Sequence, residues 1–114
     1  MKGHHLIVDV QDIKNNTMLY FVEEVKMLLR RVIRDCRLNV VNEAGHQFRP
    51  YGATYVYVLS ESHLSIHTYP EHKACFIDLF CCSADFDVDV AQRSIENLFP
   101  NATFDVHYVS RSSV

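Results

Sequence analysis

The stretch 54-TYVYVLSESHLSIHTY-69 contains two strand-like runs joined by a few polar residues. Aromatic and β-branched residues alternate in 54-TYVYVL-59, and apolar and polar residues alternate again from His63 to Tyr69. A connection this short permits only an antiparallel hairpin, because parallel strands need a crossover of a dozen or more residues. The stretch therefore predicts two neighbouring strands of a mostly antiparallel sheet.

The flanking sequence adds further strands and two helices. Apolar residues recur at helical spacing from Met18 onward, with charged residues largely on the other face, and Thr17 is a plausible N-cap. Asp85, Asp87 and Asp89 supply acidic caps for a second, shorter helix. The predicted elements are strand 4–10, helix 18–38, strand 38–48 with a break near Gly45, strands 54–59 and 63–69, a turn at 70–73, strand 74–82, helix 88–98, strand 103–109 and a frayed tail over 110–114.

The order β-α-β-β-β-β-α-β predicts an α+β fold, a two-layer sandwich with a mostly antiparallel sheet and two helices on one face. A length of 114 residues is typical of one domain, and 48% hydrophobic with 22% charged residues is an ordinary globular composition. The chain shows no internal repeat or linker. We therefore expect a single domain over residues 1–114.

Charge and hydropathy argue against two classes of partner. The net charge is −3 and the lysines and arginines are scattered, which gives little support to a nucleic-acid partner. The apolar runs are far shorter than the ~20 residues of a membrane span. The N-terminal MKGHHLIVDV turns acidic too early for a signal peptide. These features predict a soluble, cytoplasmic protein that binds neither nucleic acid nor membrane.

Cysteines and histidines give no metal-binding pattern in the sequence. The four cysteines, Cys36, Cys75, Cys81 and Cys82, form no CxxC pair, so reduced thiols are the preferred interpretation. His4, His5, His46 and His72 are too dispersed in sequence to argue for a metal site. No metal is therefore predicted.

The turn between the two central strands has two interpretations. Ser60-Glu61-Ser62 could be a polar hairpin turn, with His67 a strand histidine and Cys82 a packing thiol, and the local pattern by itself favours this. Alternatively, a sharp and strained turn would expose the Glu61 carbonyl to the Ser62 hydroxyl.

A longer motif favours the second interpretation. The segment 51-YGATYVYVLSESHLSIHTYPE-71, continued by 76-FIDLFCC-82, resembles the signature region of S-adenosylmethionine decarboxylases of the short prokaryotic type. This is a self-cleaving family that depends on a pyruvoyl group. The upstream FRPYG at 48–52 and HHLIVDV at 4–10 fit the same proteins. The resemblance is strongest from residue 48 to residue 82.

The resemblance implies that the chain cuts itself between Glu61 and Ser62. Ser62 attacks the Glu61 carbonyl, the peptide becomes an ester, and His67 removes the α-proton of residue 62. β-Elimination and hydrolysis then leave a pyruvoyl group, so that the chain is divided into segments 1–61 and 62–114. Thr54 stands where the family has a serine that assists the rearrangement, and its extra methyl group restricts χ1.

The resemblance also implies roles in decarboxylation. The pyruvoyl ketone forms a Schiff base with the substrate amine and accepts electrons as CO₂ leaves. Cys82 matches the proton donor, and Cys81 would face the site instead if the strand register slipped by one residue.

Substrate-binding roles follow from the same resemblance. Glu71 matches the residue that binds the ribose hydroxyls, and Phe48 matches the aromatic ring that stacks on adenine. Leu64 is expected to offer a backbone or apolar contact. Leu6 and Ile7 stand where some relatives have a second aromatic residue.

The expected function is decarboxylation of S-adenosylmethionine, which makes the aminopropyl donor for spermidine synthesis. The family implies a homodimer with two active sites built from both protomers. One alternative is a pyruvoyl-dependent decarboxylase of ornithine or arginine. Another is a regulatory paralogue without activity, which the retained Ser62, His67 and cysteine disfavour.

Overall fold

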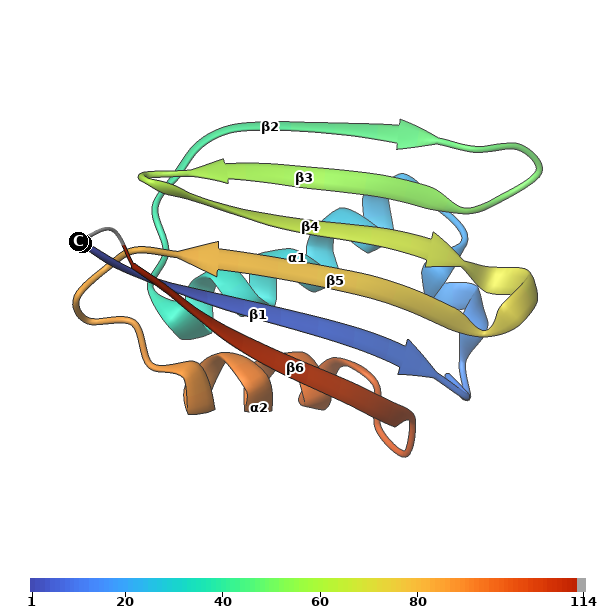
Figure 1. Cartoon of the computed structure of the whole chain (residues 1–114). Helices are drawn as coiled ribbons and strands as arrows, with labels where there is room; N and C mark the ends of the chain where they lie inside the picture. Colours follow the sequence, from blue (N-terminus) through green and yellow to red (C-terminus); the bar gives the residue numbers. More distant parts are fainter. Residues whose placement is uncertain (113–114) are drawn as a thin grey trace.

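The computed structural model describes residues 1–112 and has six strands in a single sheet with two α-helices on one face (Figure 1). The sheet order is β2-β3-β4-β5-β1-β6. This confirms the predicted α+β sandwich. The elements are β1 (Lys2–Gln11), η1 (Asn16–Leu19), α1 (Val22–Cys36), β2 (Val40–Gln47), β3 (Ala53–Leu59), β4 (Ser62–Tyr69), η2 (Pro70–His72), β5 (Ala74–Cys81), α2 (Val88–Leu98) and β6 (Thr103–Ser112).

Every strand pair within residues 1–112 is antiparallel. β3 and β4 form the predicted hairpin, in which Leu59 pairs with Ser62 across a two-residue turn. β4 continues through η2 into β5, while β1 is inserted between β5 and β6. The short turns set the order of the central strands, and the helices carry the chain across the sheet.

The core lies between the sheet and the two helices. Alternate residues of each central strand are fully buried there, as Leu64 and Ile66 of β4 show, and they pack against Leu29 of α1 and Ile95 of α2. Each such side chain contributes about 1.5–3 kcal/mol relative to an exposed position. The intervening residues lie on the other face of the sheet, which neither helix covers and which we call the open face (Figure 1).

The first helix begins four residues later than its pattern predicts. Asn16–Leu19 is a 3₁₀ helix, α1 starts at Val22, and the Thr17 hydroxyl donates to Asn15 instead of capping the helix. The cause is tertiary: the Gln47 side chain accepts from the Val22 N–H at 2.7 Å and donates to the Tyr20 carbonyl at 2.9 Å. These bonds hold a bend where local spacing alone indicates a continuous helix.

Two further predictions were wrong. β2 passes through Gly45 without a break, and its register shifts between Val40 and Asn42 instead. A Cβ atom at position 45 would lie 2.2 Å from the Tyr55 ring, so glycine is needed here for packing. Residues 110–112 of the expected frayed tail extend β6, in which Ser112 pairs with Lys2. Positions 113 and 114 lie outside the described residues.

Neither helix in the described part of the chain has the length and apolar composition needed to cross a membrane.

Candidate active site

The β3–β4 turn is held by the segment that follows α1. The Ser60 N–H donates to the Asn39 carbonyl at 3.0 Å, and the Asn39 side chain donates to the Ser60 hydroxyl at 2.8 Å. Glu61 has a φ of 68°, in the left-handed region that residues with a Cβ atom disfavour. The turn therefore stores some backbone strain at the residue before Ser62.

Strain alone does not single out this turn, because other non-glycine residues also have positive φ. What distinguishes the turn is the hydroxyl beside it. The Ser62 Oγ accepts a hydrogen bond from the Cys82 N–H at 3.3 Å. A potential nucleophile, the peptide bond that it would attack and a thiol-bearing residue thus lie together. We call Glu61, Ser62 and Cys82 the hairpin end.

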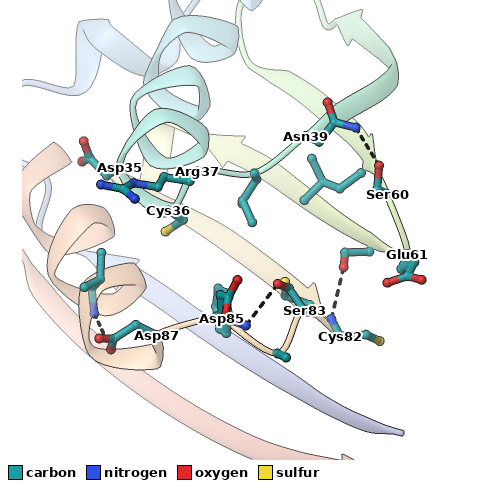
Figure 2. Close-up of a pocket in the computed structure, with 17 residues that line it drawn as sticks. Asp35, Cys36, Arg37, Asn39, Ser60, Glu61, Cys82, Ser83, Asp85 and Asp87 are labelled. Atoms are coloured by element: carbon teal, nitrogen blue, oxygen red, sulfur yellow. Dashed lines mark hydrogen bonds between the residues drawn. The ribbon is translucent and has the colours of Figure 1, made fainter.

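A cavity of about 740 Å³ opens at the hairpin end (Figure 2). It lies where the turn, the end of α1 and the loop before α2 meet, and its volume is typical of small-molecule sites. Its charged lining residues are four acids and one base, which favours a cationic ligand. These residues are Asp35, Glu61, Asp85, Asp87 and Arg37.

Three of the lining residues are cysteines, and their environments differ. Cys81 is buried, whereas Cys82 is half-buried and its N–H contacts Ser62. The pKa of Cys36 is raised to about 11, mainly by burial and then by the nearby Asp35 carboxylate. Cys36 is therefore a thiol at neutral pH, and Cys82 has the better position for proton transfer near residue 62.

The other predicted residues gather at the opposite end of the sheet. Thr54 pairs with His67 across β3 and β4, and a 3.0 Å hydrogen bond joins Thr54 Oγ1 to His67 Nδ1. Phe48 follows β2, and Glu71 lies in η2 directly after β4. In Figure 1 the β2–β3 connection and η2 lie together, away from the β3–β4 turn. We call Phe48, Thr54, His67 and Glu71 the far end.

The two ends are too far apart to act together within one chain. Ser62 and His67 are five positions apart on the same strand, which corresponds to about 17 Å. His67 is exposed and belongs to the open face, like His63 and Tyr69. Leu64 lies between the two ends with its side chain fully buried under the sheet, so only its backbone could contact a ligand.

Sequence reasoning missed several residues near the hairpin end. Asn39 fixes the turn through contacts that span 21 positions, and no local pattern could reveal this. Asp35 lies on the exposed side of α1, where carboxylates are common, so nothing in the sequence indicates that it lines the cavity. His5 belongs to a set of histidines too dispersed in sequence to indicate a metal site, yet it lies close to His63 and Asp78 in the structure.

Comparisons with known proteins agree with one another. The sequence model of a family described as S-adenosylmethionine decarboxylase matches residues 4–112. The structure is similar to the crystal structure of the adenosylmethionine decarboxylase from Aquifex aeolicus VF5, with a TM-score of 0.84 at 29% identity over 98% of this chain and 92% of that one.

Two curated relatives are both named S-adenosylmethionine decarboxylase proenzyme. The protein from Thermosipho melanesiensis is 39% identical over 85 residues, a match that spans 75% of this chain but 65% of the relative's length. The protein from Persephonella marina is 32% identical over 112 residues, which is 98% of this chain and 84% of that protein.

Proposed function

The chain belongs to the S-adenosylmethionine decarboxylase family, and from this premise we propose that it is a proenzyme that cuts itself and then decarboxylates S-adenosylmethionine. Cleavage would occur between Glu61 and Ser62 and give segments 1–61 and 62–114. Decarboxylated S-adenosylmethionine, an aminopropyl donor for spermidine synthesis, would be the product.

The observation that carries this proposal is the position of the Ser62 hydroxyl. It adjoins a left-handed Glu61 at the edge of a cavity large enough for a nucleoside-sized ligand. A positive φ is common in tight hairpin turns, so the strain at Glu61 gains weight only because a hydroxyl nucleophile and a cavity adjoin it. Here, conversion of the peptide to an ester would release the strain, and the new terminus would already line the cavity.

Residue 62 fits a pyruvoyl group, because the precursor must be a serine and the Cys82 N–H already offers a hydrogen bond there. Such a group would supply an electron sink for loss of CO₂. The chain's own residues would do the rest. Cys82 would hold and deliver the proton that the product carbon needs, while the acidic lining would attract the cationic substrate.

We further propose that the active form is a homodimer whose sites combine the hairpin end of one protomer with the far end of its partner. The separation of Ser62 and His67 on one strand supports this, since His67 can act as the base only on another chain. The open face supplies a surface, with exposed Val58, Phe76 and Tyr69. A two-fold axis through that face would bring opposite ends of β4 together.

This arrangement also accounts for the substrate-binding residues. Phe48 and Glu71 lie at the far end with His67, so they would bind adenine and ribose across the dimer interface. The exposed Phe48 ring, packed edge-on against His46 at 4.7 Å, is available for stacking.

A second substrate class is favoured by the charge of the cavity. Ornithine and arginine are also cations, and the lining acids would attract them as well. Phe48 and Glu71 favour a nucleoside, because an amino acid alone has neither a base to stack nor a ribose to bind.

The test is intact mass measurement followed by assays for release of CO₂. We expect two fragments that divide at residue 62, the second with a blocked terminus, and turnover of S-adenosylmethionine only. Turnover of ornithine or arginine alone would support the second substrate class. A single intact chain without activity would favour a regulatory protein. A cytoplasmic location stays a prediction, which cell fractionation would test.

A further inference from the structure

Three potential metal ligands converge on the open face from three adjacent strands. His5 comes from β1, His63 from β4 and Asp78 from β5, which lies between them. The register places His5 and His63 on either side of Phe80, while Asp78 lies two positions earlier on β5. Residues two apart on a strand share a face, so the three side chains meet.

The donor atoms are close enough to share one ion. All three lie within 4.8 Å of one another. His5 Nε2 contacts Asp78 Oδ1, and His63 Nε2 is 3.7 Å from the same oxygen. Metal–nitrogen bonds of about 2.0–2.1 Å in a tetrahedral site require donor atoms roughly 3.3 Å apart. Small side-chain rotations would therefore suffice.

The surroundings favour an ordered site. All three residues are half-buried, and both imidazoles pack against the Phe80 ring, with centroids 5.7 and 6.0 Å away. The backbone of each residue is fixed by ladders on the neighbouring strands. The rigid scaffold limits the loss of side-chain entropy on binding.

We propose that His5, His63 and Asp78 form a binding site for one divalent transition-metal cation of the zinc class. Two imidazoles and a carboxylate suit zinc, cobalt or nickel, whereas magnesium and calcium prefer oxygen donors alone. Three protein ligands leave a coordination position for water or, since the open face is also the proposed dimer surface, for a group of the partner protomer. The simpler alternative is a histidine–aspartate hydrogen bond that His63 merely adjoins.

The site would also join the two halves of the chain. His5 belongs to segment 1–61, while His63 and Asp78 belong to segment 62–114, and His63 directly follows Ser62. Only this consequence depends on the proposed cleavage. The ligands themselves are the same in an uncut chain.

The test is titration of Zn²⁺ and Mg²⁺ into chelator-treated protein, in both the wild type and the uncut Ser62→Ala chain. Native mass spectrometry gives the number of ions, and competition with a chromophoric chelator gives the affinity. We expect one Zn²⁺ per chain in both proteins, with a dissociation constant in the micromolar range or lower, and no comparable binding of Mg²⁺. Because the Ser62→Ala chain is included, this result is independent of cleavage and activity.

Variants locate the ion. His5→Asn, His63→Asn and Asp78→Asn are each expected to weaken Zn²⁺ binding by more than about 100-fold, beyond the effect of losing an outer-shell partner. The matched control is His107→Asn, which breaks an exposed histidine–aspartate pair with Asp105 and should leave binding unchanged. Circular dichroism identifies any variant that does not fold. If one of the three ligand variants is lost in this way, the other two still show whether these residues bind the ion.

Absence of one-ion binding in the wild type would overturn the proposal. So would equal loss in the His107→Asn control, or Mg²⁺ binding as tight as Zn²⁺ binding. Thermal unfolding gives a separate measurement, because an ion that binds only the folded state should raise the midpoint of the wild type and not that of His5→Asn.

Discussion

The hairpin end and the far end of the sheet carry different residues of the proposed chemistry and are built differently. At the hairpin end, Ser62 and Cys82 are joined by a hydrogen bond beside a cavity whose lining is mainly acidic. At the far end, Thr54 and His67 are joined by a hydrogen bond on an exposed strand surface. One end has the proposed cleavage bond beside the cavity, and the other has the proposed base on an exposed strand surface. The comparison supports the proposal that each end is half of a composite site.

The largest expected effect comes from the hairpin end. Ser62→Ala removes the nucleophile, so cleavage and activity should both be abolished. Intact mass measurement should then show a single 114-residue chain. If this variant still cleaves, the assignment of the nucleophile is wrong.

The sharpest test of the comparison is a mixture of two inactive chains. His67→Ala alone should slow cleavage by about 10²–10⁴-fold, since it removes an acid–base group. In a mixed dimer with Ser62→Ala, however, one site regains both an intact Ser62 and an intact His67.

We therefore expect co-expression to restore cleavage of the His67→Ala chain only. With equal expression and random pairing, about half of the His67→Ala chains enter mixed dimers and become cleavable. Different affinity tags separate the chains for mass measurement. If instead each chain cleaved its own bond with its own His67, co-expression would not restore cleavage of the His67→Ala chain. That outcome would contradict the composite site.

The next largest effect is expected from the thiols that line the cavity. Cys82→Ala should lower the rate of decarboxylation by roughly 100-fold, because the product carbon loses its proton donor. Cys36→Ser, in the same cavity, is the control and should change the rate less than about twofold, since a pKa raised to about 11 makes Cys36 a weak proton donor. Equal losses would mean that the cavity needs both thiols for packing.

A moderate effect is expected at the far end. Thr54→Val keeps the shape of the side chain but removes its hydrogen bond to His67, so cleavage should slow by about tenfold, the kinetic equivalent of one such bond. Thr54→Ser keeps the hydroxyl and should cleave at least as fast as the wild type. The fraction cleaved over time, followed by gel electrophoresis, distinguishes the two variants.

The smallest effect concerns the support of the cavity. The Asp87 carboxylate caps α2 by accepting from the N–H groups of Asp89 and Val90. Asp87→Ala should therefore lower the free energy of unfolding by about 1 kcal/mol. Asp85→Ala removes a lining acid that caps no helix and should change it by less than about 0.5 kcal/mol. Urea unfolding of the uncut Ser62→Ala chain provides the measurement.

Much of the fold could be predicted because its determinants are local. The alternation over 54–59 and 63–69 and the short turn between them require a hairpin, and the helical periodicity near α1 requires a partner surface. The start of α1 could not be predicted, because Gln47 sets it from 25 positions away. The role of Gly45 in packing against Tyr55 depends on the neighbouring strand in the same way.

The candidate site residues could be named from their motif, but their arrangement in space could not be predicted. The LSESHLSIHTYPE run places Ser62 and His67 close in sequence, which suggests that they belong to one compact site within the chain. An extended strand separates residues by about 3.3 Å each, so the two side chains end up at different ends of the sheet. The cluster of His5, His63 and Asp78 was invisible for the opposite reason, since strand pairing brings together residues up to 73 positions apart.

The position of β1 in the sheet determines what a cut at residue 62 would do to the folded protein. Segment 1–61 supplies β1, β2 and β3, and segment 62–114 supplies β4, β5 and β6, yet the sheet order interleaves them. Three ladders, β3 with β4, β5 with β1 and β1 with β6, would join the two polypeptides. The cut protein would thus be an interlocked heterodimer, whose unfolding releases two chains. Its melting temperature would then rise with protein concentration, a property that the uncut protomer by itself does not have.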